Sequence, residues 1–457
     1  MRLDILSLLG GEKDVTNVIV LTHNIDFVFI QTMVLPALRR CGNSSLTIFA
    51  DAKCAEESYQ VQHLALDSLG VRFRVVPVAM QPGFRFHPKA IYLSGSNKGT
   101  LLVGSGNLTF GGWRENGEIW CRFDTDVDGT SAFSAFKSYL EDIVDLVPLG
   151  HNIRSEIKES FDGKTRPWAN QMEPPGRLIY RAAKGESLLD QMNIVGGETK
   201  PNTITVCSPY FDDQGDAVRS LSEKFGAPVR VLCQTRRSGL SKEAAARIAD
   251  VATLSTFDFH HVKIDSEVRQ AFVHAKWYAL QTGEMVRVFL GSANCSRAAL
   301  TIPGSGGNAE LLALVEMPSE EFEAQFTAEI ESIQNDPDLM SLQDVEGQEH
   351  NEILGLRVLA ARLEGGSLQI AYRSSSGVTV NKLIANDLSV DFSHVSPGIL
   401  MVMSVGSDLR TILLEGVSNG ATVRSNQIWV DNEQALSVTS RSRSVVDAIR
   451  RTVQSRT

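Results

Sequence analysis

Two short segments of this sequence repeat the same set of reactive side chains. In each segment a histidine and a lysine are separated by one residue, and an asparagine follows the histidine after twenty positions, at the end of a Gly-Ser-x-Asn turn. A glutamate follows later in each copy. The two sets are His87, Lys89, Ser105, Asn107 and Glu118, and His274, Lys276, Ser292, Asn294 and Glu310. Because both copies keep the same spacing from histidine to asparagine, we interpret them as two halves of one site.

These residue types can carry out phosphodiester chemistry. A neutral imidazole can attack phosphorus, a protonated imidazole can donate a proton to the departing oxygen, and a carboxylate can fix the tautomer of the ring. Lysine and asparagine side chains, with a serine hydroxyl or backbone N–H of the turn, can hold the phosphoryl oxygens. The lysines take the role of a divalent ion, so the pattern predicts a site without metal or cofactor. The other histidines, His23 among them, have no partners at metal-ligand spacing.

The repeated motifs resemble those of the phospholipase D superfamily, the HKD enzymes. The family's common form has an aspartate five residues after the lysine, whereas here Ser94 and Gln281 occupy those positions. Tyrosyl-DNA phosphodiesterases, a branch of that superfamily, also lack this aspartate. The segments 104–113 and 291–300 are similar to that branch and to related bacterial nucleases.

The resemblance implies a role for each repeated residue. His87 would be the nucleophile and form a phosphohistidine, and His274 would protonate the leaving group and then activate water. The reverse assignment stays open. Both lysines and both asparagines would hold phosphoryl oxygens, and the two glutamates would orient the imidazoles. The serine of each turn, together with Arg236 and Arg237 at the end of a predicted strand, completes the candidate substrate contacts.

The residues around the motifs predict a duplicated α/β unit. Each half has the pattern of alternating strands and helices, followed by two strands that carry the motif, a further strand and a closing helix. The motif-bearing strands are predicted at 86–93 and 101–104, and again at 273–280 and 286–290. The predicted fold class is therefore α/β, with two pseudo-symmetric phospholipase D-like αβα sandwich lobes and a C-terminal all-β, sandwich-like domain.

The predicted domain organisation follows from changes in composition along the chain. The divisions are a first lobe at 1–150, an inter-lobe linker rich in Gly and Pro at 151–200, a second lobe at 201–340, a β domain at 350–440 and a basic tail at 441–457. We expect one short helix in the linker, near 187–192. The β domain is expected to serve partner docking, oligomerisation or substrate positioning. The tail is predicted to be a helix that either touches nucleic acid or is simply solvated.

The composition limits the classes of protein. With 457 residues, 43% of them hydrophobic and 21% charged, the chain is expected to be folded throughout. Six cysteines without framework spacing predict reduced thiols and a cytoplasmic location. The sequence has no apolar stretch of membrane-spanning length and no convincing signal peptide. A net charge of −10 is unusual for a nucleic-acid enzyme, but Arg72, Arg74, Arg85, Lys89 and Lys98 predict a local basic cleft.

Together these features predict a metal-independent phosphodiesterase, first of all a nuclease or DNA-end-processing enzyme. A phospholipase or phosphatidyl transferase is the alternative, and a catalytically idle nucleic-acid-binding scaffold is the second alternative. The expected partner is nucleic acid, with DNA favoured over RNA, and no membrane. By analogy with relatives in bacterial genome and antiviral defence, an ATPase or helicase is a further expected partner. DNA against RNA, strand preference, mode of cleavage and oligomeric state stay open.

Overall fold

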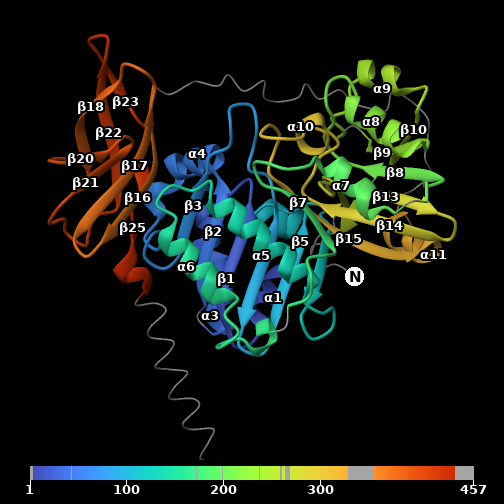
Figure 1. Cartoon of the computed structure of the whole chain (residues 1–457), viewed down its shortest axis with the longest axis horizontal. Helices are drawn as coiled ribbons and strands as arrows, with labels where there is room; N and C mark the ends of the chain where they lie inside the picture. The colour runs from blue at the N-terminus through green and yellow to red at the C-terminus, as the bar shows by residue number, and fades with distance from the viewer. Residues whose placement is uncertain are drawn as a thin grey trace, which may run out of the picture.

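The computed structural model describes residues 4–42, 44–170, 172–197, 199–235, 237–257, 260–262, 268–327 and 355–437. Within these ranges the chain forms two α/β lobes and a strand-rich C-terminal domain (Figure 1), so the predicted fold class is confirmed. Arg236 and the predicted basic tail at 441–457 lie outside the described residues. None of the described helices combines the length and the apolar character that crossing a bilayer requires.

The first lobe is built on a six-stranded mixed sheet with the order β3-β2-β1-β4-β5-β6. β1 to β3 are parallel and the remaining neighbours are antiparallel. Apolar runs in β1 and β2 are buried on both faces, because helices cover the sheet on each side. The strands are β1 (Val15–Thr22), β2 (Ser45–Asp51), β3 (Arg74–Val78), β4 (Ala90–Gly95), β5 (Gly99–Gly104) and β6 (Trp120–Asp124). The helical segments are α1 (Ile5–Gly11), α2 (Phe27–Phe29), η1 (Ile30–Val34), α3 (Leu35–Arg40), α4 (Ala52–Gln62), η2 (His63–Ala65), η3 (Gly111–Glu115), α5 (Ser131–Val144) and α6 (His151–Ser160).

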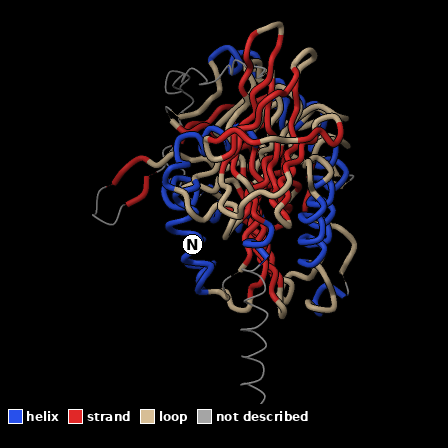
Figure 2. The backbone as a smooth tube through the Cα atoms, turned by 90° about the vertical axis from the view of Figure 1, so that its left-hand side faces the viewer, coloured by secondary structure: helices blue, strands red, loops and turns tan. Residues whose placement is uncertain are grey.

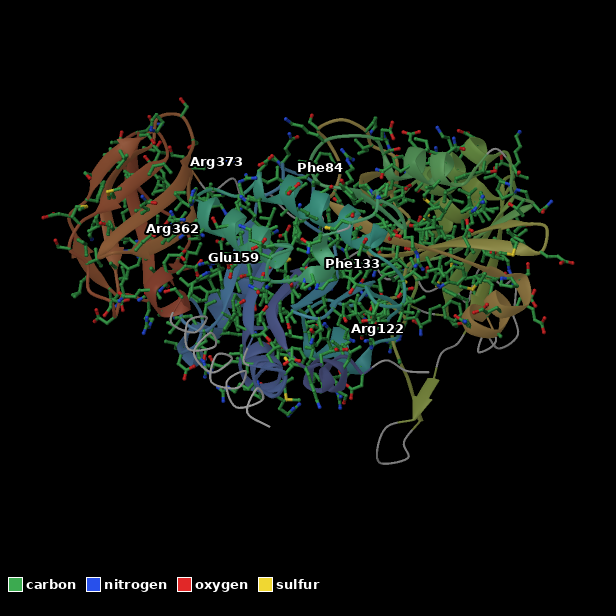
Figure 3. The ribbon with its side chains drawn as sticks, turned by 60° about the horizontal axis from the view of Figure 1, so that its bottom comes forward. Phe84, Arg122, Phe133, Glu159, Arg362 and Arg373 are labelled. Carbon is green, nitrogen blue, oxygen red and sulfur yellow. The ribbon has the colours of Figure 1, made fainter. Side chains whose placement is uncertain are left out.

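The second lobe repeats this topology, with the strand order β10-β9-β8-β13-β14-β15-β7. Its first three strands are again parallel and the following ones antiparallel. The strands are β7 (Leu178–Arg181), β8 (Thr203–Cys207), β9 (Val229–Gln234), β10 (Ala252–Phe257), β13 (Trp277–Thr282), β14 (Met285–Gly291) and β15 (Glu310–Pro318). The helical segments are α7 (Leu188–Val195), α8 (Asp216–Phe225), α9 (Lys242–Ile248), α10 (Arg297–Leu300), α11 (Ser319–Phe322) and η5 (Glu323–Thr327). The short helix η4 (Pro167–Asn170) packs instead on the first lobe, where the Trp168 indole N–H donates to the Gly95 carbonyl at 3.0 Å. The hairpin β11 (His260–Val262) and β12 (Val268–Gln270) projects from the second lobe (Figures 2 and 3).

The segment 151–200 is more regular than its glycines and prolines indicate. It contains α6, the expected short helix α7 and the strand β7, which pairs with β15 and extends the second sheet. The breaker residues lie between these elements rather than inside them. A single hydrophobic core then joins the lobes, since Phe133 and Phe136 of α5 belong to the same cluster as Leu290 and Leu311 of the second lobe.

The His-x-Lys segments differ from the prediction in their position relative to the strands. Strands were predicted at 86–93 and 273–280, but β4 begins at Ala90 and β13 at Trp277, after each lysine. Both segments are extended, and each forms main-chain hydrogen bonds with the opposite lobe. Isolated bridges join Phe86 to Ala309 and Val273 to Gly117. A propensity pattern cannot show this pairing, because the partner strand belongs to the other repeat.

The C-terminal domain is a sandwich of two sheets that packs against the first lobe (Figure 1). Trp429 packs edge to face against Phe27 and Tyr59 of that lobe, with ring centroids 5.6 and 5.2 Å away. Arg362, labelled in Figure 3, donates from β16 to the Leu149 carbonyl at 3.0 Å. The strands are β16 (Leu356–Glu364), β17 (Ser367–Ser374), β18 (Thr379–Ala385), β19 (Leu388–Val390), β20 (Ser393–Ser396), β21 (Ile399–Val402), β22 (Thr411–Ser418), β23 (Ala421–Arg424), β24 (Ile428–Trp429) and β25 (Asp431–Asn432). Oligomerisation through this domain stays a prediction.

Candidate active site

The two motif histidines are held by carboxylates from opposite lobes. Nδ1 of His87, in the first lobe, lies 3.0 Å from both oxygens of Glu310, in the second lobe. Nδ1 of His274, in the second lobe, lies 3.0 and 3.1 Å from the oxygens of Glu118, in the first lobe. A carboxylate at Nδ1 makes that nitrogen the donor and leaves Nε2 of each ring for chemistry. Each imidazole is therefore oriented by the other repeat.

Main-chain hydrogen bonds keep these cross-lobe pairs in register. The N–H of His87 donates to the Ala309 carbonyl at 2.9 Å, next to Glu310. The N–H of His274 donates to the Gly117 carbonyl, next to Glu118, also at 2.9 Å. The extended His-x-Lys segment of each lobe thus pairs with the residues before the carboxylate of the other lobe. This reciprocal pairing gives the site an approximate twofold symmetry.

Each glutamate is itself held by a serine and an asparagine of its own lobe. The Ser105 hydroxyl donates to Glu118 and the Ser292 hydroxyl donates to Glu310, both at 2.5 Å. The amide groups of Asn116 and Asn308 add a second donor to each carboxylate, at 3.3 and 3.1 Å. The sequence prediction placed the two serines among the substrate contacts, whereas their hydroxyls are buried and committed to the carboxylates. Asn116 and Asn308 were missed, although an Asn-x-Glu pattern in both copies marks them.

The glycine of each Gly-Ser turn permits this close packing. A Cβ atom at Gly104 would lie 2.3 Å from the carbonyl oxygen of Ile119 on the neighbouring strand. One at Gly291 would lie 2.4 Å from the carbonyl oxygen of Leu311. Both distances are shorter than any real Cβ contact, so a side chain there would push the strands apart. The glycines are needed to bring the serine hydroxyls within reach of the carboxylates.

The two motif lysines are fully buried beneath the histidines. Nζ of Lys89 donates to the His87 carbonyl at 2.7 Å, and Nζ of Lys276 donates to the His274 carbonyl. Burial lowers the pKa of Lys89 to about 7, although Glu310 and Glu118 raise it. Burial also lowers the pKa of Lys276 well below its ordinary value, opposed by Glu118 and assisted by the charge of Lys89. An anion bound between these lysines would favour their protonated forms, because its charge offsets both the desolvation and the mutual repulsion.

The two His–Glu pairs have different electrostatic environments. Burial, followed by the charges of Lys89, Lys276 and His274, lowers the pKa of His87 well below its usual range. Burial also lowers the pKa of His274, but the adjacent Glu118 opposes this shift.

The two carboxylates shift in opposite directions. Burial raises the pKa of Glu118, but the charge of His274, its hydrogen bond and Lys276 together bring that pKa below the ordinary value. Burial keeps the pKa of Glu310 raised despite Lys89 and Ser292. Burial therefore disfavours the protonated form of both rings, but the pKa of His274 is lowered less than that of His87 because Glu118 opposes the shift.

The two motif asparagines lie in equivalent turns that pack on the loop after the first strand of each sheet. Oδ1 of Asn107 accepts from the N–H of Asn24 at 3.1 Å. Oδ1 of Asn294 is buried and has no hydrogen-bond partner among the described residues. The turns are anchored alike, since the Thr22 hydroxyl accepts from Leu108 N–H and the Ser208 hydroxyl accepts from Cys295 N–H. Both asparagines are therefore positioned, although their amides are not bonded identically.

Of the two candidate arginines, only Arg237 can be placed. It is half-buried in the turn after β9, where its N–H donates to the Gln234 carbonyl at 3.1 Å. Among the described residues no contact joins Arg237 to either motif histidine. Gln234 was not predicted, but its side chain accepts from the Val273 N–H at 2.8 Å and donates to the Ala271 carbonyl at 2.6 Å. It thereby fixes the segment that leads into His274.

A third histidine, His23, lies against the site. Its ring centroid is 5.0 Å from that of His87, edge to face, and its Nδ1 lies 3.2 Å from the Phe86 carbonyl oxygen. His23, Asp51 and Cys54 also form a group in which one potential metal ligand from each lies within 4.8 Å of the others. Asp51 already caps α4 through one oxygen and accepts from the Phe86 N–H through the other. These bonds assign Asp51 a structural role beside His87, which the sequence spacing did not reveal.

Comparisons with known proteins agree with the geometry. A family model described as "Cardiolipin synthase, PLD-like domain" matches residues 198–334. No curated protein sequence matches the chain. The resemblance to the phospholipase D superfamily is therefore confirmed for residues 198–334, which include most of the second lobe.

Solved structures with a similar fold include yeast tyrosyl-DNA phosphodiesterase, at 12% identity and a TM-score of 0.45 over 70% of this chain and 89% of that chain. Phosphatidylserine synthase from Haemophilus influenzae is similar at 12% identity and a TM-score of 0.42, over 74% of this chain and 86% of that chain. Polyphosphate kinase from Porphyromonas gingivalis is similar at 13% identity and a TM-score of 0.39. That match covers 70% of this chain, which spans only 43% of the kinase.

Proposed function

We propose that the protein is a phosphodiesterase that cleaves nucleic acid, with DNA favoured, by double displacement at its two motif histidines and without a metal ion. The observation that carries the proposal is the reciprocal pairing of His87 with Glu310 and of His274 with Glu118, at 3.0 to 3.1 Å. Two Nε2 atoms, one per lobe, are thereby available to one phosphorus. A scaffold without catalysis has no need for two such oriented rings.

In the first step Nε2 of His87 attacks phosphorus and forms a P–N bond, while the bond from phosphorus to the leaving oxygen breaks. His274 gives the proton on its Nε2 to that oxygen. In the second step His274 takes a proton from water, the water oxygen attacks phosphorus, and the P–N bond breaks. The lysine pair and the two motif asparagines stabilise the charge on the non-bridging oxygens.

The electrostatic difference between the two pairs supports this order of roles. A nucleophile must be neutral, and the pKa of His87 is lowered well below its usual range. A general acid must be protonated, and the negative charge of Glu118 limits the lowering of the His274 pKa by burial, so that His274 is the more readily protonated of the two rings. The opposite assignment would put the proton on the ring whose carboxylate, Glu310, has a raised pKa.

Burial and charge support a polyanionic, unpaired substrate. The reacting rings are only 6% and 8% exposed for His87 and His274, so a phosphate must enter a narrow opening. Lys89, Lys276 and the exposed Arg85 concentrate positive charge there, although the chain carries a net charge of −10. A nuclease or DNA-end-processing role fits these features. Work beside an ATPase or helicase in bacterial genome defence stays a prediction from the resemblance alone.

Phosphatidyl transfer is the second candidate, since the matching family model is described as a cardiolipin synthase domain. The deciding experiment incubates the purified protein, in EDTA, with labelled single- and double-stranded DNA, RNA and phosphatidylcholine vesicles. Release of nucleotides without choline is the expected result. Release of choline alone would indicate a phospholipase in place of a nuclease. If none of the substrates is cleaved, the proposal that the protein is an enzyme would be refuted.

Variants test the assignment of roles. His87→Ala and His274→Ala should each lower turnover by at least about 10³-fold, while far-UV circular dichroism stays unchanged. Wild-type protein quenched in alkali during turnover should carry labelled phosphate on His87, and His274→Ala should accumulate this adduct. His394→Ala is the matched control, because His394 is exposed on β20 of the C-terminal domain. Full activity in either motif variant would contradict the mechanism.

A further inference from the structure

The two halves of the site keep the same reacting side chains but differ at the residue that precedes each motif. Arg85 lies two positions before His87, and Phe272 lies two positions before His274. Their main chains are equivalent, since each carbonyl accepts an N–H from the opposite lobe, at 2.9 and 2.8 Å. The side chains have unrelated chemistry: one is an exposed cation and the other is a half-buried aromatic ring.

A second pair of equivalent positions differs in the same direction. Asn24 follows Thr22 by two residues after β1, and Tyr210 follows Ser208 by two residues after β8. The loops are built alike, because each hydroxyl donates to the carbonyl two residues later, at 2.7 and 2.8 Å. The first-lobe rim is therefore polar and cationic, and the second-lobe rim is aromatic.

The aromatic residues of the second rim form a cluster with the catalytic ring. The Tyr210 and Phe272 ring centroids lie 6.3 Å apart, at an interplanar angle of 60°. Their distances to the His274 ring are 6.3 and 5.8 Å. Tyr210 is nevertheless 44% exposed, and its backbone is fixed by a bridge to Gly239. Close to half of the Tyr210 side chain is therefore exposed to solvent, on a loop held beside the imidazole of His274.

We infer that Tyr210 and Phe272 form a stacking platform for a nucleobase on the His274 side of the scissile phosphate, and that Arg85 attracts backbone phosphate on the His87 side. The inference rests on the proposed function and extends it to the substrate. In-line displacement with His87 as nucleophile puts the leaving oxygen on the His274 side. The stacked base therefore belongs to the nucleoside that departs.

Stacking suits these residues because every base has a planar face, so a platform gives affinity without sequence preference. An acyl chain would instead need an extended apolar surface, and the aromatic cluster beside His274 consists of only Tyr210 and Phe272. A half-buried Arg237 lies in the turn that leads to Gly239, the bridge partner of Tyr210. The platform therefore adjoins a further cation suited to a polyanionic chain.

The experiment compares thymidylyl-thymidine with two analogues in which one base or the other is replaced by hydrogen, all in EDTA. Loss of the base of the leaving nucleoside should raise KM by about 5- to 150-fold, the range expected for one base–aromatic stack. Loss of the other base should change KM little. The value of kcat should stay within about threefold, since stacking acts at a distance from phosphorus.

Variants assign the effect to the platform. Tyr210→Asn and Phe272→Arg convert the second rim into its first-lobe counterpart, and both should raise KM for the intact dinucleotide and abolish the difference between the analogues. Tyr210→Trp keeps an aromatic ring at this position and should therefore keep the difference in KM between the analogues. This variant shows whether the loss in Tyr210→Asn comes from the missing ring or from misfolding. Phe110→Asn is the matched control, because Phe110 is exposed to nearly the same extent, 45%, and belongs to the first lobe.

Equal KM values for all three dinucleotides, or an unchanged difference in Tyr210→Asn, would overturn the platform while leaving phosphodiester cleavage intact. Cleavage of phosphatidylcholine without cleavage of any dinucleotide would overturn it in favour of a choline site. If no substrate is cleaved, the proposed function fails, and the stacking platform is then tested by a binding measurement. Fluorescence anisotropy of labelled oligothymidylate and an abasic strand of equal length should then show base-dependent binding that Tyr210→Asn abolishes, and equal binding of both strands would overturn the inference.

Discussion

Replacing Glu118 by glutamine removes one negative charge from the site without changing the size of the side chain. The carboxylate accepts from His274 Nδ1 at 3.0 and 3.1 Å and from Ser105 at 2.5 Å. A glutamine amide can accept from the ring only through its oxygen, and its NH₂ group favours the opposite tautomer. Glu118→Gln should therefore impair the acid and base functions of His274 while leaving His87 and Glu310 unaltered.

The magnitude follows from the hydrogen bond that is weakened. A hydrogen bond to a charged group contributes about 1.5–3 kcal/mol, so the steps that use the His274 imidazolium should slow by about 10- to 150-fold. A fixed wrong tautomer would increase this loss towards about 10⁴-fold. Some substrates have a leaving group that departs without a proton. With such a substrate, the rate of attack by His87 should change by less than about threefold.

A p-nitrophenyl phosphodiester in a stopped-flow assay separates the two steps, because p-nitrophenolate leaves unprotonated. Glu118→Gln should give a fast burst of one equivalent followed by slow turnover, whereas Glu310→Gln should slow the burst itself. Glu320→Gln, at an exposed position on α11, is the control for loss of a surface charge. The reasoning is refuted if Glu118→Gln slows burst and turnover equally. If Glu310→Gln gives the fast burst and Glu118→Gln slows the burst, the roles of the two histidines are the reverse of those proposed.

Three further outcomes are expected. Sulfate affinity, measured by titration calorimetry, should fall as pH rises from 6 to 8, because Lys89 with a pKa of about 7 must be protonated to bind the anion, and Lys89→Gln should remove this pH dependence. Burial raises the pKa of Asp431 to about 7, so the folded state holds more protons than the unfolded state between about pH 4 and 7. The free energy of unfolding should therefore fall as pH rises through that window. Asp431→Asn should raise Tm at pH 8 but not at pH 4. Arg74 would still pair with two other carboxylates in that variant. Trp429→Ala should lower the free energy of unfolding in urea by about 3–5 kcal/mol, because it removes the ring that packs against Phe27 and Tyr59 of the first lobe. A change below about 1 kcal/mol would contradict that packing.

Much of the fold could be predicted because the strands are marked by local apolar runs. β5 and β14 coincide within a few residues with the strands predicted at 101–104 and 286–290, and the alternation of strands and helices was predicted in both halves. The short strand β7 was not predicted. It is stabilised by pairing with β15 across a gap of more than a hundred residues, and no local pattern reports such a partner.

The site could be predicted in its residues but not in its connections. Repeated spacing identified His87, Glu118 and their counterparts, because each repeat carries its own copy. Spacing within one repeat cannot tell that Glu118 faces the histidine of the other repeat, since the exchange depends on how the lobes dock. Spacing also indicated no partner for His23, because its contact with His87 joins the loop after β1 to the segment before β4.

The exchange of carboxylates between lobes has a consequence for biosynthesis. A ribosome that has released the first lobe has made His87 but not Glu310, and the carboxylate already present, Glu118, waits for a ring that has not been translated. A prematurely terminated chain therefore carries no oriented imidazole. Under the proposed mechanism, cleavage would therefore require the second repeat to have folded onto the first.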